Sequence, residues 1–271
     1  MSIQKLTNKI TAFSLLLLVA CQGTDNDNNK TETSPSPNNP VVGILGYSLV
    51  ASYPHDTSSY TQGLQVYQGR LFEGTGQYGS SNLLEVDLNT GNRKKAVALD
   101  SRYFGEGITI FKDTIYQLTW REKKIFVYTL DFKKIKEIDF NKEGWGITHN
   151  GNELIVSNGS GELFFYQPGT MKLIRTQLVT EAGSPSYNLN ELEFIEGFVY
   201  ASQYTTPYIL KINPTTGEIV AKADISRLWQ QALQLNPQAE VPNGIAYDES
   251  AKKIYVTGKW WPQLYEIRFS Q

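Results

Sequence analysis

One glutamate stands at an unusual place in the chain. In the stretch YFGEGITI, Glu106 lies between two glycines at the start of an apolar run that is typical of a buried strand. Glutamate and glycine are both poor strand residues, so a reason other than strand formation is needed. A carboxyl group buried beside aromatic side chains such as Phe104 has a raised pKa, because burial disfavours its charged form. Such a group can exchange a proton near neutral pH, which is general acid–base chemistry.

The position of Glu106 recurs in five segments that align at intervals of about forty to fifty residues. Each segment reads as a strand, a tight turn and a second strand. The segments are QGLQVYQGRLFEGTG, EGITIFKDTIYQLTW, WGITHNGNELIVSNG, NELEFIEGFVYASQY and NGIAYDESAKKIYVTGK. Their equivalent apolar residues are Leu64, Ile108, Ile147, Leu192 and Ile245. Two residues before these apolar residues, the five segments have, in order, Gln62, Glu106, Trp145, Asn190 and Asn243.

The elements that must position these residues are the blades of a β-propeller. Two more strand-like pieces follow each aligned pair, and four strands in about forty residues are the signature of one blade. The fifth repeat ends after its third strand, QLYEIRFSQ, and the early segment YSLVASYP supplies the missing fourth. We therefore predict an all-β, five-bladed propeller closed by an N-terminal strand, with a short helical insertion at SRLWQQALQLNPQAE; a two-sheet sandwich is the alternative.

This fold gathers the recurring residues at one mouth of the central channel. The first strand of a blade lies nearest the channel, and the second returns antiparallel, so its end lies on the same face. Residues at that end are Gly76, Trp120, Gly159, Tyr204 and, after a longer turn, Lys259. The predicted mouth therefore combines one carboxylate, one ammonium group, carboxamides and aromatic walls, which is typical of a ligand pocket.

Simpler interpretations exist for each residue. Glu106 and Lys259 could form a structural ion pair, and Trp120 and Trp145 are individually more typical of a core. Asn residues in NLNELE and PNG suit local turns. The shared position of the set, and not any single residue, favours a site.

Composition narrows the classes of function. The chain has 271 residues and a formal net charge of -2, which gives no support for nucleic-acid binding. One Cys and two His argue against a His- or Cys-based zinc site. We therefore expect carboxylates, amides, lysine and aromatic side chains to carry the chemistry.

The N-terminal region is expected to direct the protein to a membrane. Residues 1–21 combine lysines, the short apolar run AFSLLLLVA and the sequence LVAC, which resembles a bacterial lipobox ending at Cys21. We predict lipidation of Cys21 and attachment at the bacterial cell envelope, periplasmic or on the cell surface; a plain secretory signal is the alternative. Residues 22–42 read as a polar tether, which leaves 43–271 as the propeller domain.

Eight ordered motifs resemble one known family. They are YTQGL, GTGQYGSS, FGEGIT, YQLTW, EGWGIT, LNELEF, VPNGIAYD and TGKWWPQLYEI, and they run from about Tyr47 to Ile267. Together they resemble the plant-type glutaminyl cyclases, or glutamine cyclotransferases, which fold as five-bladed propellers. The family is unrelated to the zinc-dependent animal glutaminyl cyclases.

The resemblance implies both an activity and roles for residues. The family converts N-terminal glutamine of peptides or proteins to pyroglutamate and releases ammonia. Its catalytic glutamate falls on Glu106. Its pocket glutamine, asparagine and lysine fall on Gln62, Asn190 and Lys259, and its pocket aromatics on Phe104, Trp120 and Trp145. Two positions depart from the family, which has phenylalanine where Tyr60 stands and tryptophan where Tyr204 stands; we expect both to remain pocket walls.

The implied mechanism needs no metal, although a structural calcium in the channel stays open. The glycines beside Glu106 would let the backbone turn at the mouth and leave the carboxylate unobstructed. We expect a monomer whose partners are peptides with N-terminal glutamine. A propeller that only binds peptides or glycans, and a metal-dependent propeller lactonase, are the alternatives.

Overall fold

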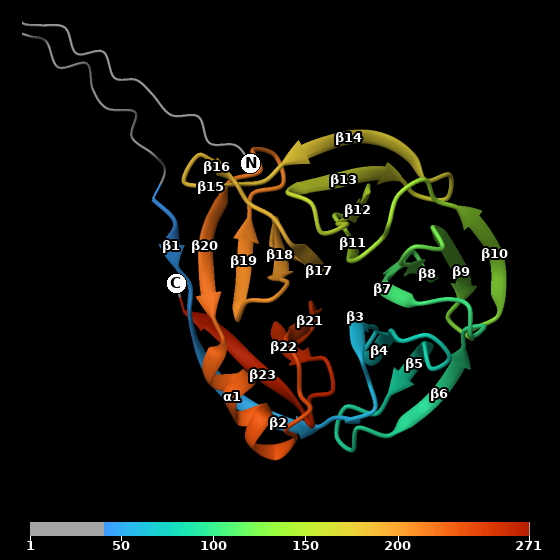
Figure 1. Ribbon diagram of the computed structural model, residues 1–271, viewed down its shortest axis with the longest axis horizontal. Helices are drawn as coiled ribbons and strands as arrows, with labels where there is room; N and C mark the ends of the chain where they lie inside the picture. The colour runs from blue at the N-terminus through green and yellow to red at the C-terminus, as the bar shows by residue number, and fades with distance from the viewer. Residues whose placement is uncertain (1–40, 271) are drawn as a thin grey trace, which may run out of the picture. The chain divides into compact units, whose positions relative to one another are not determined.

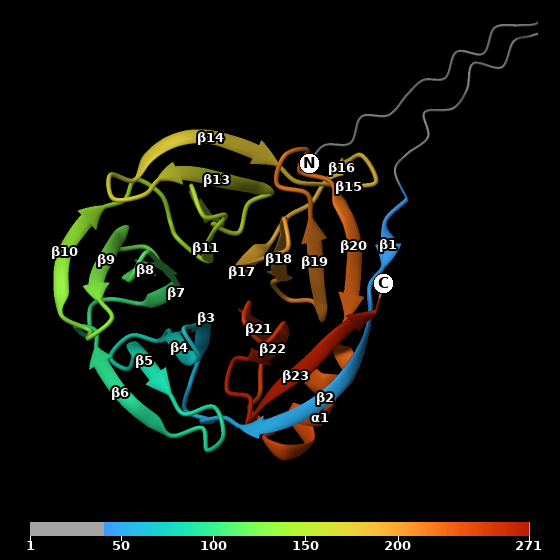
Figure 2. The same ribbon diagram turned by 180° about the vertical axis from the view of Figure 1, so that it is seen from behind.

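The computed structural model describes residues 41–270, and Cys21, with the predicted signal and most of the tether, lies outside them. Strands make up nearly all regular structure in this part of the chain. Within residues 41–270, no helix is long and apolar enough to cross a membrane. Five sheets of four or five strands surround a common axis in this part of the chain (Figure 1 and, from behind, Figure 2). The predicted five-bladed propeller is therefore confirmed.

The five blades follow one another along the chain, each with its inner strand first. The first contains β3 (Thr61–Tyr67), β4 (Arg70–Thr75), β5 (Asn82–Val86) and β6 (Arg93–Ala98). The second contains β7 (Gly105–Phe111), β8 (Thr114–Thr119), β9 (Lys124–Thr129) and β10 (Lys134–Asp139). The third contains β11 (Ile147–His149), β12 (Leu154–Val156), β13 (Glu162–Gln167) and β14 (Lys172–Leu178). The fourth contains β17 (Leu189–Ile195), β18 (Phe198–Gln203), β19 (Tyr208–Ile212) and β20 (Ile219–Asp224).

The fifth blade closes the ring with the two ends of the described chain. It contains β21 (Pro242–Asp248), β22 (Lys253–Gly258) and β23 (Gln263–Ser270), and its outer strand is β2 (Gly46–Pro54). Strand β2 runs antiparallel to β23, from Gly46 opposite Ser270 to Pro54 opposite Gln263. This is the closure predicted from YSLVASYP, and it removes the free edge that an open ring would have.

Three small elements decorate the ring. Helix α1 (Ser226–Leu235) occupies the predicted insertion and packs against the fifth blade, where it buries Leu228 and Ala232. Strand β1 (Gly43–Ile44) adds a parallel fifth strand to β20, and β15 (Thr180–Glu181) pairs with β16 (Ser184–Pro185). These three short strands were not predicted from the sequence.

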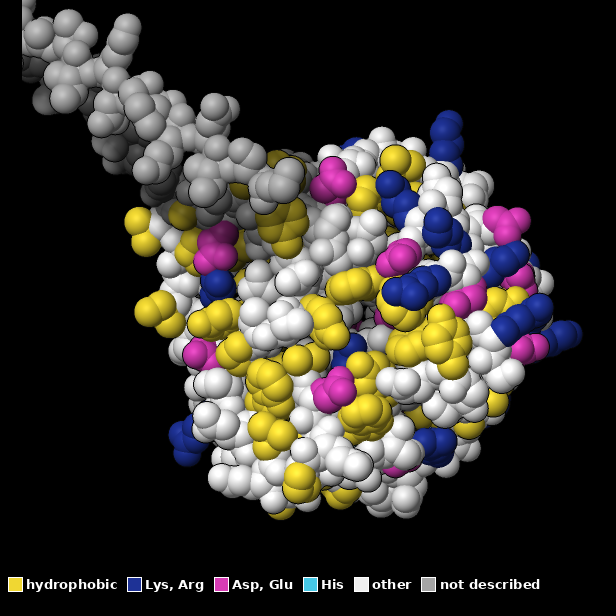
Figure 3. Space-filling view, viewed as in Figure 1, with side chains coloured by type: hydrophobic (Ala, Val, Ile, Leu, Met, Phe, Trp, Pro, Cys, Tyr) yellow, Lys and Arg dark blue, Asp and Glu magenta, His cyan; other side chains and the backbone are white. Residues whose placement is uncertain are grey.

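Apolar packing between neighbouring blades holds the ring together. Residues 41–270 contain five clusters of buried hydrophobic side chains, and each cluster includes residues of two adjacent blades. For example, Phe72 of the first blade packs with Ile108 and Ile110 of the second, and all three are at most 2% exposed. The inner strands are buried along most of their length, whereas outer strands such as β6 alternate between exposed and half-buried residues. Hydrophobic and charged side chains meet around a hollow near the centre of one face (Figure 3).

Irregular pairing shapes the start of the inner strands. The register between first and second strands shifts in four blades, between Thr61 and Gly63, Gly105 and Ile108, Leu189 and Leu192, and Pro242 and Ile245. Such bulges turn a side chain away from the regular alternation of a strand, and they are frequent beside functional sites. They fall at the recurring positions of Gln62, Glu106, Asn190 and Asn243.

The glycines that flank Glu106 serve close packing and not a backbone turn. Neither Gly105 nor Gly107 has a positive φ. A Cβ atom on Gly107 would lie 2.7 Å from the carbonyl oxygen of Trp145, to which the Gly107 amide donates a hydrogen bond. The expectation of a freely turning backbone was therefore wrong, because adjacent blades approach too closely here for any side chain.

Candidate functional site

Four of the five recurring residues, all except Asn243, line one cavity of about 220 Å³. Its lining includes all nine residues proposed for catalysis or substrate binding, together with Gln77, which was not predicted from the sequence. The lining residues are Tyr60, Gln62, Gln77, Phe104, Glu106, Trp120, Trp145, Asn190, Tyr204 and Lys259. The cavity has room for about one amino-acid residue with its side chain.

The antiparallel pairing of first and second strands brings these residues together. Trp120, Tyr204 and Lys259 each follow the end of a second strand, β8, β18 or β22. The amide of Trp120 donates to the carbonyl oxygen of Phe104 at 3.1 Å, which fixes the end of β8 beside the start of β7. The amide of Tyr204 donates in the same way to Asn188, just before β17.

Glu106 is buried without a hydrogen-bond partner. Its side chain belongs to a residue only 4% exposed, and the hydrogen bonds found within residues 41–270 include none to its carboxyl group. Burial raises the pKa of Glu106 well above its usual value; Lys259 opposes this rise, and Glu122 and Glu143 add to it. The carboxyl group is thus suited to hold or accept a proton near neutral pH.

Lys259 faces the cavity without contacting Glu106 directly. It is 3% exposed, and no ion pair within 4.0 Å joins it to Glu106, so the structural ion pair considered from sequence is not formed. Its ammonium group lies over the rings of Tyr60 and Tyr204, 4.5 and 5.0 Å from their centroids. Burial lowers the pKa of Lys259, and the charges of Glu106 and Glu240 oppose that change.

Aromatic rings form two walls. In one, Phe104 packs edge-on against Tyr60, Trp120 and Tyr78, with centroids 5.4 to 6.2 Å apart. In the other, Trp145 packs against Tyr204 at 5.6 Å. The positions of the rings relative to one another are therefore set by contacts within each wall.

Three carboxylates outside the cavity hold the polar tips of the first wall. Glu240 accepts a hydrogen bond from the Tyr60 hydroxyl at 3.0 Å, and Glu143 accepts one from Nε1 of Trp120 at 3.0 Å. Glu122 accepts one from the Tyr78 hydroxyl at 2.8 Å. All three lie in loops outside the repeated positions, so the repeat in the sequence does not predict them.

Asn243 differs from the other recurring residues. It does not line the cavity and is 1% exposed. Its side-chain nitrogen donates to Oε1 of Gln62 at 2.9 Å and to the carbonyl oxygen of Thr61 at 3.0 Å. The side-chain oxygen of Asn190, which does line the cavity, is buried without a partner. Within residues 41–270, no group of three or more His, Cys, Asp or Glu is placed to hold a metal ion.

Known proteins match this chain along most of its length. A family model described as glutamine cyclotransferase matches residues 16–269. The chain is 37% identical over 228 residues to a glutaminyl-peptide cyclotransferase of Arabidopsis thaliana, covering 82% of this chain and 71% of that protein. The crystal structure of Myxococcus xanthus glutaminyl cyclase aligns with a TM-score of 0.79 at 32% identity, covering 85% of this chain and 98% of the other. The chain therefore belongs to the glutamine cyclotransferase family.

Proposed function

We propose that this protein is a glutaminyl-peptide cyclotransferase, which converts the N-terminal glutamine of peptides or proteins to pyroglutamate and releases ammonia. The observation that carries the proposal is Glu106, whose buried carboxyl group has no partner and opens on a cavity with room for about one residue. Family membership supports the same reaction.

The reaction joins two ends of one residue. The α-amine nitrogen attacks the carbonyl carbon of its own side-chain amide, a new N–C bond forms, and the oxygen takes up negative charge. Glu106 accepts a proton from the attacking nitrogen and gives it to the amide nitrogen. The old C–N bond then breaks, ammonia leaves, and the carbonyl reforms as the lactam.

The cavity supports this reaction by position and charge. The aromatic walls hold the substrate side chain folded back toward its own amine, which provides the proximity that an intramolecular attack needs. Lys259, Asn190 and Gln62 offer hydrogen bonds to the substrate amide and to the developing oxyanion. The raised pKa of Glu106 lets one group act first as base and then as acid.

The test is turnover of a peptide that begins with glutamine. Ammonia release and the matching loss of mass are followed with the purified wild type and with Glu106→Gln. We expect turnover above the spontaneous rate in the wild type only. Folded wild-type protein that binds the peptide without releasing ammonia would indicate the binding propeller instead.

We further propose that catalysis requires no metal. The residues offered for the chemistry are a carboxyl group, an ammonium group and amides, which act here by proton transfer and hydrogen bonding. Activity is expected to survive a chelator. A fall in the unfolding temperature with chelator, at unchanged initial activity, would reveal a structural ion such as calcium.

Cys21 is proposed to anchor the enzyme at the cell envelope through attached lipid. The support is the sequence LVAC after a short apolar run. In cells that process lipoproteins, the wild type should partition into the detergent phase and Cys21→Ser should not. Equal partitioning of the two would indicate a plain secretory signal.

A further inference from the structure

We propose that Asn243 is a positioning residue that orients the carboxamide of Gln62, so that Gln62 presents only hydrogen-bond donors to the substrate. This inference rests on the proposed function, because it assigns Gln62 a specific part in that reaction. Asn243 lies behind Gln62, on β21 of the fifth blade, whereas Gln62 lies on β3 of the first. The contact therefore crosses between blades.

The orientation of the Asn243 amide follows from its neighbour. A backbone carbonyl can only accept hydrogen bonds, so the atom of Asn243 that lies 3.0 Å from the Thr61 oxygen must be nitrogen. The opposite orientation would place two acceptors against each other. Its oxygen is buried without a hydrogen-bond partner, so no contact of the oxygen favours either orientation. The contact of the nitrogen with Thr61 therefore decides the orientation.

The orientation of Gln62 follows in turn. The same Asn243 nitrogen lies 2.9 Å from one end of the Gln62 carboxamide, and that end must be the accepting oxygen, Oε1. Gln62 is 3% exposed and lines the cavity, so the end left for a ligand is its NH₂ group. The cavity wall thus offers N–H donors at this point and no acceptor.

A donor is what the proposed reaction needs there. The substrate amide oxygen gains negative charge when the α-amine attacks, and fixed donors stabilise that charge more than they stabilise the substrate. An acceptor in the same place would repel the oxyanion. Asn243 therefore contributes through Gln62 and does not touch the reacting atoms.

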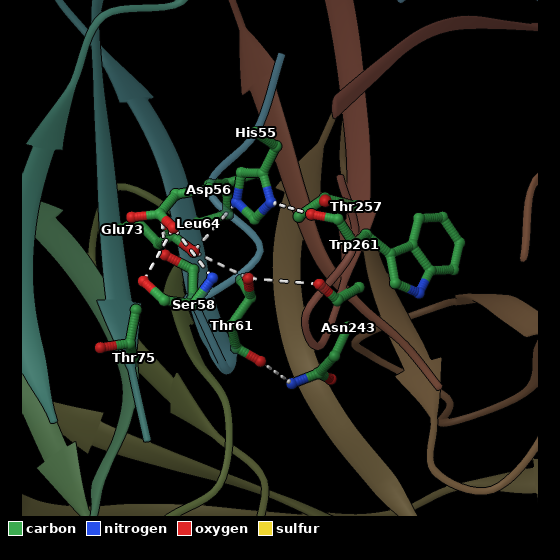
Figure 4. A network of polar contacts seen from close by, with 12 residues as sticks. His55, Asp56, Ser58, Thr61, Leu64, Glu73, Thr75, Asn243, Thr257 and Trp261 are labelled. Atoms are coloured by element: carbon green, nitrogen blue, oxygen red, sulfur yellow. Dashed lines mark hydrogen bonds and ion pairs between the residues drawn. The ribbon is translucent and has the colours of Figure 1, made fainter. Parts of the chain in front are cut away.

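Thr61, which sets the orientation, is itself held by a buried network across the closure of the ring (Figure 4). Its hydroxyl donates to Oε1 of Glu73 at 2.7 Å. The same oxygen lies 3.2 Å from Nε2 of His55, whose Nδ1 lies 2.7 Å from the carbonyl oxygen of Trp261. Glu73 and Thr61 belong to the first blade, and Trp261 to the fifth, so the network fixes the two blades against each other at Gln62.

The direct test replaces the donor at Asn243 by an acceptor of the same shape. In Asn243→Asp, the side chain cannot donate to both Thr61 and Gln62, because even a protonated carboxyl group has one hydrogen. Gln62 is expected to turn its NH₂ toward the aspartate and its oxygen toward the cavity. We expect kcat to fall about 10²-fold, as for loss of one oxyanion donor, with KM changed less than about threefold.

A second variant also places an acceptor oxygen of residue 62 in the cavity, without altering Asn243. Gln62→Glu leaves one oxygen facing Asn243 and puts the other in the cavity. We expect a loss in kcat similar to that of Asn243→Asp. In a double-mutant cycle, Asn243→Ala should cost about tenfold in wild type and less than about twofold in Gln62→Ala, because its effect passes through Gln62. Equal costs in both backgrounds would overturn the proposal and indicate a purely structural residue.

Solvent exchange of the Gln62 side-chain NH₂ provides a readout that does not need turnover. Its nuclear magnetic resonance signal is identified by its absence in Gln62→Glu. Exchange should be fast in the wild type, where the group faces the cavity, and at least tenfold slower in Asn243→Asp. A wild-type NH₂ group already protected would overturn the assignment. Absence of wild-type turnover would instead count against the proposed function.

Thr109→Val is the matched control. Thr109 lies on inner strand β7, is 1% exposed, and its hydroxyl is buried without a partner. The change alters a buried polar residue of the inner ring that lies outside both the cavity lining and the Gln62 contacts. Its kcat should stay within about twofold of wild type, and a loss as large as that of Asn243→Asp would attribute the effect to general disturbance of the ring.

Discussion

The inner strands carry a buried glutamate near each end of the channel, and the two carboxyl groups have opposite surroundings. Glu106, near the start of its strand, has no hydrogen-bond partner within residues 41–270. Glu193, further along its strand, accepts hydrogen bonds from the Tyr247 amide at 3.0 Å and the Thr148 hydroxyl at 3.4 Å. Burial raises the pKa of both, that of Glu193 to about 8 despite those hydrogen bonds.

The difference separates a reactive group from a structural one. The cavity beside Glu193, at about 490 Å³, is larger than the one beside Glu106. However, the carboxyl group of Glu193 already accepts hydrogen bonds from neighbouring blades. At the Glu106 end the unpaired carboxyl group shares its cavity with the ammonium group of Lys259 and with aromatic walls. Neither burial nor pKa distinguishes the two ends, whereas unused hydrogen-bonding capacity does.

The largest effect is expected when Glu106 is replaced by glutamine. Glu106→Gln should lower kcat about 10²- to 10⁴-fold, because the proton shuttle is lost. Glu193→Gln is its matched control and should leave kcat within about threefold of wild type. Steady-state ammonia release measures both. Comparable losses of kcat in the two variants would contradict the assignment of Glu106 as the reactive glutamate and of Glu193 as the structural one.

Lys259→Met tests the electrostatic partner that only the first end possesses. We expect kcat to fall about 10²-fold, because one donor to the oxyanion is removed. Lys259 lowers the pKa of Glu106, so its loss should raise that pKa and move the acidic limb of the pH–rate profile to higher pH. An acidic limb that stays in place, or moves to lower pH, would contradict this coupling.

Glu193→Gln should in turn change the dependence of stability on pH. The pKa of Glu193 rises on folding from 4.5 to about 8. The favourable contribution of its protonation to the free energy of unfolding is therefore fully present below pH 4.5 and is lost as pH rises to about 8. The slope for one group is at most about 1.4 kcal/mol per pH unit. Between pH 5 and pH 8, wild type should therefore lose more stability than the variant. The denaturant midpoint of the variant minus that of wild type should be larger at pH 8 than at pH 5. Parallel profiles would show that Glu193 does not titrate as its surroundings predict.

The smallest effect is expected from the carboxylates behind the aromatic wall. Glu143→Gln retains an acceptor for Trp120 and removes a charge that raises the pKa of Glu106. KM should change less than about threefold. The acidic limb of the pH–rate profile should move slightly to lower pH, opposite to the shift expected for Lys259→Met. Shifts of the same sign in both variants would refute the assignment of charges around Glu106.

Residues that share a repeated position could be predicted from sequence, and residues that depend on contacts between blades could not. The alignment placed Gln62, Glu106 and Lys259 together because repetition makes sequence spacing equivalent to spatial position. Gln77 was missed because it lies beyond the second strand with a positive φ of 92°, outside the alignment.

Contacts between blades explain the other differences from expectation. The role of Gly107 depends on the distance to the neighbouring blade, and that of Asn243 depends on the carbonyl group opposite it. Neither of these contacts with another blade can be inferred from the residues adjacent in sequence. Strand β1 pairs through two residues only, Gly43 and Ile44, which is too short for a periodic signal.

The closure of the ring by β2 and β23 also sets when the site can exist during protein synthesis. Glu106 and Trp120 leave the ribosome well before Lys259, and β23 follows all the other described strands. A growing chain that ends before β23 has no partner for β2, and one that ends before Lys259 lacks an ammonium group in the cavity. The complete site therefore forms only after β23 has been made, so a chain shortened before β23 should be inactive even with every residue around Glu106 in place.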